Sequence, residues 1–327
     1  MKTTMREAIR ATLAEEMRRD GRVFILGEDV GVYGGTLQVT AGLFDEFGPE
    51  RVIDTPLSEV AITGAAIGAA MMGLRPVLEI MFADFIPLAL DQILNNAAKM
   101  CYGYDGDMSV PMVLRAPFGG GMRSGMHHCQ NLEAIFAHIP GIYVVMPTTP
   151  ADAKGLLLAA IRDPNPVIYL EHKMLYGVRG DVTEGDAVIP FGKAAVRREG
   201  RDVTIVACGA LVNKSLIAAG ELAKAGIEAE VIDLRSIRPL DEDAIITSVR
   251  KTSRLVIAHE ACRTGGIAGE IAAVVSAGAI DALDAPVARV TAPDAPVPFS
   301  PTLEDAFLPR PEQIVAEVKA LFGKRFA

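Results

Sequence analysis

Short apolar segments alternate along the chain with longer segments in which apolar residues recur at helical spacing. The short segments do not alternate apolar with polar residues, which is typical of parallel strands buried on both faces of a sheet. We therefore expect strands over residues 23–27, 51–54, 75–82, 111–116, 143–146, 167–170, 202–207, 229–233, 254–258 and 287–290. Helices are expected over residues 5–19, 87–100, 150–161, 212–225, 241–251, 266–277 and 312–323, with one more after residue 59.

A polar, turn-rich stretch divides this pattern into two blocks. We expect a first domain over residues 1–185, a linker over 186–200 and a second domain over 201–327. Both blocks carry the same succession of apolar strands and helices, which predicts an α/β protein with two parallel-sheet domains. A chain of 327 residues is long enough for two domains of ordinary size.

The composition of the chain indicates which binding partners and which cellular compartment to expect. Half of the residues are apolar and the formal net charge is -9, which argues against nucleic acid and an anionic membrane surface as partners. The four cysteines form no Cys-x-x-Cys pair, so we expect free thiols in a reducing compartment. The first residues lack the apolar run of a secretory signal, and the uncharged run over residues 60–74 is too short to span a membrane. We expect a cytoplasmic protein.

Glu59 stands before a segment, Val60 to Gly73, that carries no charge and consists largely of Ala, Gly, Ile and Met. This composition predicts a helix packed tightly on all sides, so the carboxylate at its start loses water and its ionised form is disfavoured. A glutamate that holds or releases a proton near neutral pH is suited to catalysis. The alternative is an ordinary glutamate at a helix start, favoured by the helix dipole, with Pro56 and Ser58 as the preceding turn.

A glycine-rich loop with adjacent histidines follows the strand expected at 111–116. Its glycines let the backbone approach a ligand, and ligands of open parallel sheets sit beyond the carboxyl ends of the strands. His127 and His128 could move protons or bind a substrate anion there. A surface or helix-capping histidine is one alternative. A zinc site using His127, His128 and Cys129 is another, although adjacent residues rarely ligate one ion and no distant His or Cys set is evident.

The sequence lacks the motifs that grip phosphate. It has no Gly-x-x-x-x-Gly-Lys-Ser/Thr loop, and Gly119 to Ser124 fails the Gly-x-Gly-x-x-Gly pattern at its last place. It also lacks the Gly-x-Ser-x-Gly elbow of serine hydrolases. The residues by themselves therefore indicate a proton-handling Glu and His without a phosphate grip in the same chain.

Several motifs, spread over nearly the whole chain, resemble those of a known family. They are Gly27-Glu-Asp-Val-Gly31, Asp54-Thr-Pro-Leu-Ser-Glu59, Glu79-Ile-Met-Phe-Ala-Asp-Phe85, Asp91-Gln-Ile-Leu-Asn95, His128-Cys-Gln130, Asp152-Ala-Lys-Gly-Leu156 and Ala160-Ile-Arg-Asp-Pro-Asn-Pro166. Together they resemble the beta subunit of the two-chain, thiamine-diphosphate-dependent 2-oxo acid dehydrogenase component, of the transketolase-like superfamily. The resemblance implies a pyrimidine-binding domain followed by a transketolase C-terminal-like domain.

The resemblance assigns roles to particular residues. Glu59 would hydrogen bond N1′ of the cofactor's pyrimidine and push the ring towards the imino form that takes up the thiazolium proton. The pyrimidine pocket would be lined by Leu57, Met81 and Phe85. His128 would contact the substrate or the lipoyl group during acyl transfer. The family usually has Ser after this histidine, where this chain has Cys129, so the hydrogen bonding around His128 is expected to differ.

The resemblance also implies metal ions. A structural potassium would be bound, mostly through backbone oxygens, by Met112, Ala160, Ile161, Asp163 and Asn165. Without the resemblance, the segment Asp163-Pro-Asn-Pro reads as a simple turn. The cofactor's diphosphate and its magnesium would be held by the alpha subunit, through a Gly-Asp-Gly…Asn-Asn motif that this chain lacks.

The complex implied by the resemblance has two alpha and two beta chains, with cofactor sites between unlike chains. It would oxidatively decarboxylate a 2-oxo acid and pass the acyl group to lipoamide on an acyltransferase core. Acetoin cleavage and branched-chain 2-oxo acid oxidation are alternatives, and the motifs at 81–85 and 171–177 favour the pyruvate or acetoin branch. The region around Asp294 and the last helix resembles the surface that docks the acyltransferase's basic subunit-binding domain.

Two further alternatives belong to other classes. A non-catalytic docking subunit is opposed by the presence of Glu59 and His128. A single-chain transketolase-type enzyme is opposed by the chain length and by the missing diphosphate motif.

Overall fold

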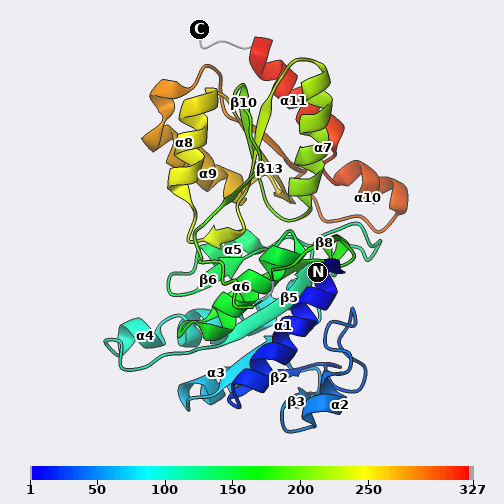
Figure 1. Ribbon diagram of the computed structural model, residues 1–327, viewed down its shortest axis with the longest axis vertical. Coiled ribbons are helices and arrows are strands. Elements are labelled where there is room, and N and C mark those ends of the chain that lie inside the picture. Colours follow the sequence, from blue (N-terminus) through cyan, green and yellow to red (C-terminus); the bar gives the residue numbers. More distant parts are fainter. Residues whose placement is uncertain (1, 184, 324–327) are drawn as a thin grey trace. The chain divides into compact units, whose positions relative to one another are not determined.

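The computed structural model describes residues 2–183 and 185–323, which form two compact α/β units (Figure 1). The first unit consists of the chain up to Phe118 together with Ile135–Phe191. The second consists of Gly119–Ala134 together with the chain from Gly192 onward. Each unit is built on its own sheet, and the expectation of two parallel-sheet domains is confirmed.

Parallel pairing runs through the main sheet of the first unit. Neighbouring strands hydrogen bond in the order β6-β7-β5-β4-β2-β3, and each of these pairs is parallel. Their bounds are β2 Val23–Gly27, β3 Val52–Asp54, β4 Arg75–Glu79, β5 Val113–Phe118, β6 Tyr143–Val145 and β7 Val167–His172. Separately, β1 (Lys2–Thr4) pairs antiparallel with β8 (Arg179–Asp181). Because parallel strands point the same way, the carboxyl ends of β3, β2 and β4 meet along one edge.

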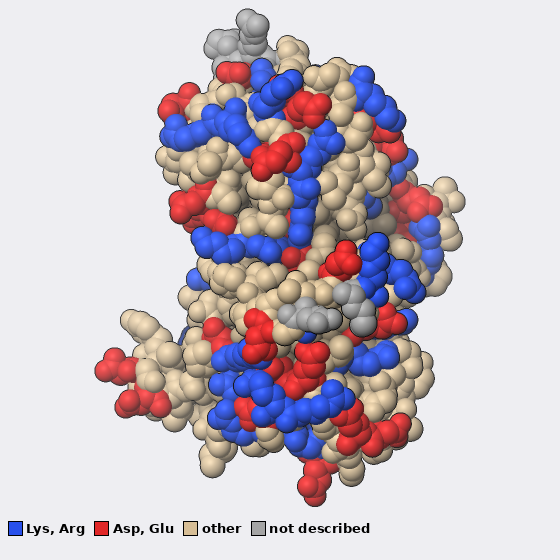
Figure 2. Space-filling view, in the orientation of Figure 1, with Lys and Arg blue, Asp and Glu red and all other residues tan. Residues whose placement is uncertain are grey.

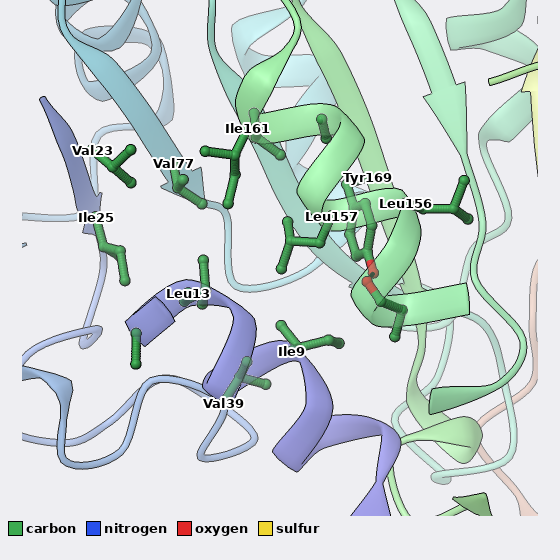
Figure 3. Packing of buried hydrophobic residues seen from close by; sticks show 14 of the residues in the cluster. Ile9, Leu13, Val23, Ile25, Val39, Val77, Leu156, Leu157, Ile161 and Tyr169 are labelled. Atoms are coloured by element: carbon green, nitrogen blue, oxygen red, sulfur yellow. Dashed lines mark hydrogen bonds between the residues drawn. The ribbon is translucent and has the colours of Figure 1, made fainter. Parts of the chain in front are cut away.

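The core of the first unit lies between its sheet and two long helices, α1 (Met5–Arg19) and α6 (Pro150–Arg162). Figure 3 shows Ile9 and Leu13 of α1 facing Leu157 of α6, with side chains from the strands completing the cluster. Both helices begin with capping boxes, in which Thr4 and Thr149 exchange hydrogen bonds with the residue three positions later. Two short helices, α2 (Leu43–Phe47) and α5 (Glu133–Ala137), lie in the connecting segments.

The regular helix expected over residues 87–100 is not formed. Ala83–Ala89 is a 3-10 helix (η1), Gln92–Ala97 is a π-helix (η2), and α4 (Met100–Gly103) follows. Pro87 lies inside η1, where it has no amide hydrogen to donate and its ring crowds the preceding turn. The prediction of one regular helix is therefore wrong, although the segment is helical in its parts.

The second unit contains a five-stranded sheet in the order β14-β13-β10-β11-β9. The strands β10 (Val203–Ala207), β11 (Ala229–Asp233), β13 (Leu255–Cys262) and β14 (Ala288–Ala292) pair in parallel. An antiparallel edge strand that the sequence did not predict, β9 (Ala195–Arg198), completes the sheet. Because β9 pairs with β11, which is buried along its whole length, the half-buried β9 forms this edge of the sheet.

Two pairs of helices cover opposite faces of this sheet (Figure 1). One pair is α7 (Ala210–Lys224) with α11 (Pro311–Gly323), and the other is α8 (Glu242–Thr252) with α9 (Ile267–Gly278). A short helix, α10 (Pro301–Phe307), precedes α11, and the small elements β12 (Ser236–Arg238), η3 (Lys173–Leu175) and η4 (Ile280–Ala282) complete the described chain.

Within residues 2–183 and 185–323, no helix is both long and apolar enough to cross a membrane. On the face drawn in Figure 2, both acidic and basic side chains are present and lie among one another.

Candidate active site

Glu59 is the first residue of α3 (Glu59–Met71), and its side chain is half-buried. The helix buries one face, formed by Ile62, Thr63, Ala66, Ile67 and Ala70. Its other face, which includes Val60 and Met71, is exposed in the single chain. The prediction of a helix packed on all sides is therefore wrong for the chain by itself, because an apolar composition does not distinguish burial within a chain from burial against a partner.

A second carboxylate, Glu28, lies next to the start of α3. It directly follows β2, its side chain is buried, and its Oε1 accepts a hydrogen bond from the backbone N–H of Ser58 at 3.3 Å. Burial raises the pKa of Glu28, and the negative charge of Glu59 raises it further. The sequence places Glu28 in the motif Gly27–Gly31 but indicates no role for it, because the motif does not show that Glu28 and Glu59 lie near each other.

The expected pyrimidine-pocket residues are distributed over the same edge of the sheet. Leu57 and Glu59 follow β3, whereas Met81 and Phe85 follow β4, and β2 lies between those two strands. Leu57 is 78% exposed, and Met81 and Phe85 are half-buried. The ring of Phe85 also meets Phe82 edge to face, with 6.2 Å between ring centroids. The structure thus brings the four residues to one edge and leaves apolar side chains accessible there.

Glycines let the loop after β2 lie close to this edge. The carboxylate of Asp54 accepts the N–H of Gly31 at 2.6 Å, and a side chain at Gly31 would come within 2.5 Å of the same carboxylate. Gly35 has a φ of +80° and would place a side chain 2.8 Å from Glu79. Residues with a Cβ are therefore excluded at both points, and the loop is held against β3 and β4.

A buried ion cluster lies beneath the same edge. Arg115 of β5 donates to Glu171 of β7 from Nε at 2.7 Å and from Nη2 at 2.9 Å, and to Glu79 of β4 from Nη1 at 2.8 Å. Tyr176 donates its hydroxyl to Glu171 at 2.5 Å. Burial opposes the charge on the guanidinium, but the two carboxylates outweigh it and raise the pKa of Arg115. Burial raises the pKa of Glu79 against the opposing effect of Arg115. Sequence reasoning missed this cluster because its members are far apart in the chain.

The histidine loop, Gly119–Ala134, belongs to the second unit. His127 is exposed and His128 is half-buried, with the N–H of His128 directed at the carbonyl of Gly125 at 3.4 Å. Cys129 is fully buried, whereas His127 is exposed. In the described part of the chain, no group of three or more His, Cys, Asp or Glu side chains is placed to hold a metal ion. The zinc alternative at these residues therefore has no ligand set.

All four cysteines are free thiols, as predicted. Cys129 and Cys208 are buried, whereas Cys101 and Cys262 are exposed. Burial raises the pKa of Cys208 well above its ordinary range, which makes that thiol a poor nucleophile.

The residues expected to bind potassium lie at the end of α6, in the turn before β7 and before β5. Arg75 reaches this group: its Nη1 donates to the carbonyl oxygens of Ile161 at 2.7 Å and Asp163 at 3.2 Å. The carbonyl of Met112 accepts the N–H of Val167, and the carboxylate of Asp163 accepts two hydrogen bonds from Asn165. Carbonyl oxygens suit potassium, but a guanidinium already brings positive charge to two of the expected ligands. These residues therefore do not present a set of oxygens that requires a bound cation.

Two family models cover most of the chain. The model described as "Transketolase, pyrimidine binding domain" matches residues 1–179, and "Transketolase, C-terminal domain" matches residues 192–314. The 2-oxoisovalerate dehydrogenase subunit beta of Bacillus subtilis is 49% identical over 317 residues, which are 96% of this chain and 97% of that protein. The chain belongs to the transketolase-like beta subunits of 2-oxo acid and acetoin dehydrogenases.

Other relatives of this beta subunit have different substrates in their names. The acetoin:2,6-dichlorophenolindophenol oxidoreductase subunit beta of Bacillus subtilis is 48% identical, with 98% of this chain and 97% of that protein covered. The pyruvate dehydrogenase E1 component subunit beta of Rickettsia felis is 47% identical, with 98% of each chain covered. A solved structure described as a split gene transketolase, inactive beta4 tetramer, has a TM-score of 0.80 and 26% identity, covering 98% of this chain and 99% of that one.

Proposed function

We propose that this beta subunit works with an alpha subunit as the decarboxylating component of a 2-oxo acid dehydrogenase. The reaction is oxidative decarboxylation of a 2-oxo acid, with transfer of the acyl group to lipoamide on an acyltransferase core. Relatives named for 2-oxoisovalerate, acetoin and pyruvate are 49%, 48% and 47% identical, so overall similarity does not separate these substrates. Our preference for pyruvate rests on the motifs at residues 81–85 and 171–177.

The observation that carries the proposal is the pair of carboxylates, Glu28 and Glu59, at the carboxyl edge of the first unit's sheet. When bound, thiamine diphosphate supplies the carbon nucleophile that attacks the oxo group. Glu59 would hydrogen bond N1′ of the pyrimidine ring and exchange a proton with it. Burial and the charge of Glu59 raise the pKa of Glu28, so the protonated form of Glu28 is favoured beside Glu59. Leu57, Met81 and Phe85 provide the apolar walls that position the ring.

His128 acts later, in acyl transfer. The lipoyl disulfide must open, and the sulfur that leaves must be protonated. An imidazole can act as the general acid that donates this proton. The glycines beside His128 leave room for a lipoyl arm to approach the loop.

The diphosphate and its magnesium are assigned to the alpha subunit, since this chain has no phosphate-binding motif. Two features support an assembly of several chains. The exposed apolar face of α3 and the 95% exposed Tyr102 of α4, in the same unit, offer surface for partner chains. The related split transketolase is described as an inactive tetramer of beta chains. We propose two alpha and two beta chains, with cofactor sites between unlike chains.

The acyltransferase core is assigned to the region around Asp294 and α11. Asp294 is exposed and accepts hydrogen bonds from Thr264, from Oγ1 at 2.7 Å and from the backbone N–H at 2.9 Å. These bonds lower the pKa of Asp294, so its negative charge persists in mildly acidic solution. A basic docking domain would be attracted to such a surface, and the attraction would weaken as the salt concentration rises.

Acetoin cleavage and branched-chain 2-oxo acid oxidation are the two alternative reactions, because proteins of the same family are named for them. Each is favoured by a relative of nearly the same identity. A structural potassium at the turn before β7 is also proposed, and it would share the carbonyl oxygens of Ile161 and Asp163 with Arg75. We also propose a cytoplasmic complex, which the free thiols support.

Reconstitution tests the proposal. Beta alone, alpha alone and the mixture are assayed for thiamine diphosphate binding and for turnover of pyruvate, branched-chain 2-oxo acids and acetoin. We expect tight cofactor binding and turnover from the mixture only, with pyruvate fastest. Turnover by beta alone would favour a single-chain transketolase-type enzyme. A mixture that docks the core without any turnover would favour a non-catalytic docking subunit.

A further inference from the structure

Two buried carboxylates hold the backbone of the histidine loop, Gly119–Ala134. The first is Glu260 of β13, whose Oε1 accepts the N–H of Gly120 at 2.6 Å and the side-chain amide of Asn131 at 3.3 Å. These two partners stand near opposite ends of the loop. One carboxylate therefore ties both ends to the same strand of the second unit.

The second carboxylate, Glu304 of α10, holds the turn that precedes the histidines. Its Oε1 accepts the N–H of Gly121 at 2.9 Å, and its Oε2 accepts the N–H and Nη1 of Arg123 at 3.3 and 2.8 Å. Arg123 has a φ of +59°, a left-handed conformation that residues with a side chain adopt only when the surroundings support it. Its guanidinium is also bound by Asp305, at 2.7 Å from Nη2.

Close packing accompanies these bonds. A side chain at Gly120 would come within 2.8 Å of Leu308, and one at Gly125 would come within 2.8 Å of Phe299. The loop is therefore fitted to the surface of the second unit. Because hydrogen bonds to ionised carboxylates are among the stronger ones in proteins, the two glutamates contribute much of what keeps this glycine-rich segment in one conformation.

We propose that Glu260 and Glu304 are positioning residues for His128. This inference rests on the proposed role of His128 in acyl transfer. Both glutamates act through loop amides rather than by touching the substrate. Because they keep the loop ordered beforehand, the loop loses less conformational entropy when the lipoyl group binds. Acyl transfer to lipoamide therefore depends on them, whereas cofactor binding and the proton exchange at Glu59 do not.

Loop order can be measured without any activity. Arg123 is the one Lys or Arg between residues 119 and 134, so trypsin cleavage after Arg123 reports opening of this loop. In the complex of full-length chains, Glu260→Ala and Glu304→Ala should raise the cleavage rate at Arg123 by about tenfold or more, from the loss of charge-assisted hydrogen bonds. Glu260→Gln keeps an acceptor oxygen and should restore most of the resistance. Glu242→Ala, an exposed acid on α8, is the matched control and should leave the rate unchanged.

Hydrogen exchange on the unmodified complex provides a measurement that needs no variant to fold. The amides of Gly120 and Gly121 should be strongly protected, because both donate to buried carboxylates. Exchange of these amides at the rate of an open loop would overturn the proposal.

Kinetics then test the link to function. Lipoamide-dependent kcat of the Ala variants should fall about tenfold, while reduction of an artificial dye acceptor and the affinity for thiamine diphosphate change little. Unchanged cleavage at Arg123, or increased cleavage with normal lipoamide turnover, would overturn the positioning role. A failure of the proposed function looks different: His128→Ala would then retain lipoamide turnover, whatever the state of the loop.

Discussion

Arg115 donates two parallel hydrogen bonds to Glu171, at 2.7 and 2.9 Å, with both side chains fully buried in the first unit. Removal of the guanidinium would leave Glu171 and Glu79 buried without a counter-charge. We therefore expect Arg115→Met to lower the free energy of unfolding by about 3–5 kcal/mol, as for other broken buried ion pairs. Denaturant titration measures this.

The matched control is an exposed ion pair of similar geometry. Arg18 donates to Glu46 at 2.5 and 2.7 Å on the surface. Arg18→Met should change the free energy of unfolding by less than about 1 kcal/mol, because water and salt screen exposed pairs. Equal losses for the two variants would contradict the importance we give to burial of the Arg115 cluster.

Glu59→Gln should leave folding and assembly intact but slow deuterium exchange at the thiazolium carbon of the bound cofactor by about 100-fold or more. The reason is that an amide can hydrogen bond N1′ but cannot exchange a proton with it. Nuclear magnetic resonance of acid-quenched samples measures the exchange. Glu50→Gln, at an exposed position before β3, is the control. A normal exchange rate in Glu59→Gln would remove Glu59 from the mechanism.

Adjacent histidines provide a matched pair for the acyl-transfer step. His128→Ala should lower lipoamide-dependent turnover by about 100-fold without weakening thiamine diphosphate binding. His127→Ala removes the same side chain one position earlier, where it is exposed, and should have little effect. Calorimetry and steady-state kinetics separate binding from transfer. If the two variants lose the same activity, the specific role of His128 is wrong.

Much of the fold could be predicted because buried parallel strands and amphipathic helices have distinct patterns. The helix expected over residues 5–19 is α1, with the same bounds, since Thr4 and Glu7 form a capping box at its start. Where local chemistry competes with the pattern, prediction fails. Pro87 broke the helix expected over 87–100, and β9 pairs through contacts that no local pattern encodes.

Site residues that a local sequence pattern marks could be predicted. Site residues whose contacts join positions far apart in the sequence could not. Glu59 stands out because a charge begins a long uncharged segment. Glu260 and Gly120 are 140 residues apart in sequence, and the hydrogen bond between them follows from the tertiary fold. The same holds for Arg115 and Glu171, which two neighbouring strands bring together.

Arg75 makes a prediction about potassium. Its guanidinium competes with a cation for the carbonyl oxygens of Ile161 and Asp163. We expect Arg75→Met to gain a potassium-specific rise in the thermal unfolding midpoint that exceeds the rise of the unmodified chain, because a ligand that binds the folded state stabilises it. Scans in potassium, sodium and choline chloride measure this. A larger potassium effect in the unmodified chain would indicate that Arg75 supports the ion rather than replacing it.

Glu133 makes a prediction about pH. It is fully buried in the second unit, and its Oε1 lies 3.9 Å from Nδ1 of His259, too far for a hydrogen bond. Among the described residues, its Oε2 has no hydrogen-bond partner. Burial raises the pKa of Glu133 from its ordinary value of 4.5 to about 7, and the charge of Glu260 contributes. The folded chain therefore holds a proton that the unfolded chain releases.

The sign of the effect follows from this difference. The stability associated with the protonated carboxyl is fully present below about pH 4.5 and is lost as the pH rises to about 7. Glu133→Gln cannot ionise, so it should be favoured over the unmodified chain by an amount that grows across this range and then levels off, at most about 3 kcal/mol. Burial lowers the pKa of His259 to about 4, which destabilises both proteins alike in acid, so the comparison must use the difference between them. Denaturant titrations at a series of pH values give that difference. If the difference in free energy of unfolding between the two proteins stays constant from pH 4.5 to 7, Glu133 is ionised in the folded chain throughout this range. A neighbouring group must then neutralise its charge, and the raised pKa would be wrong.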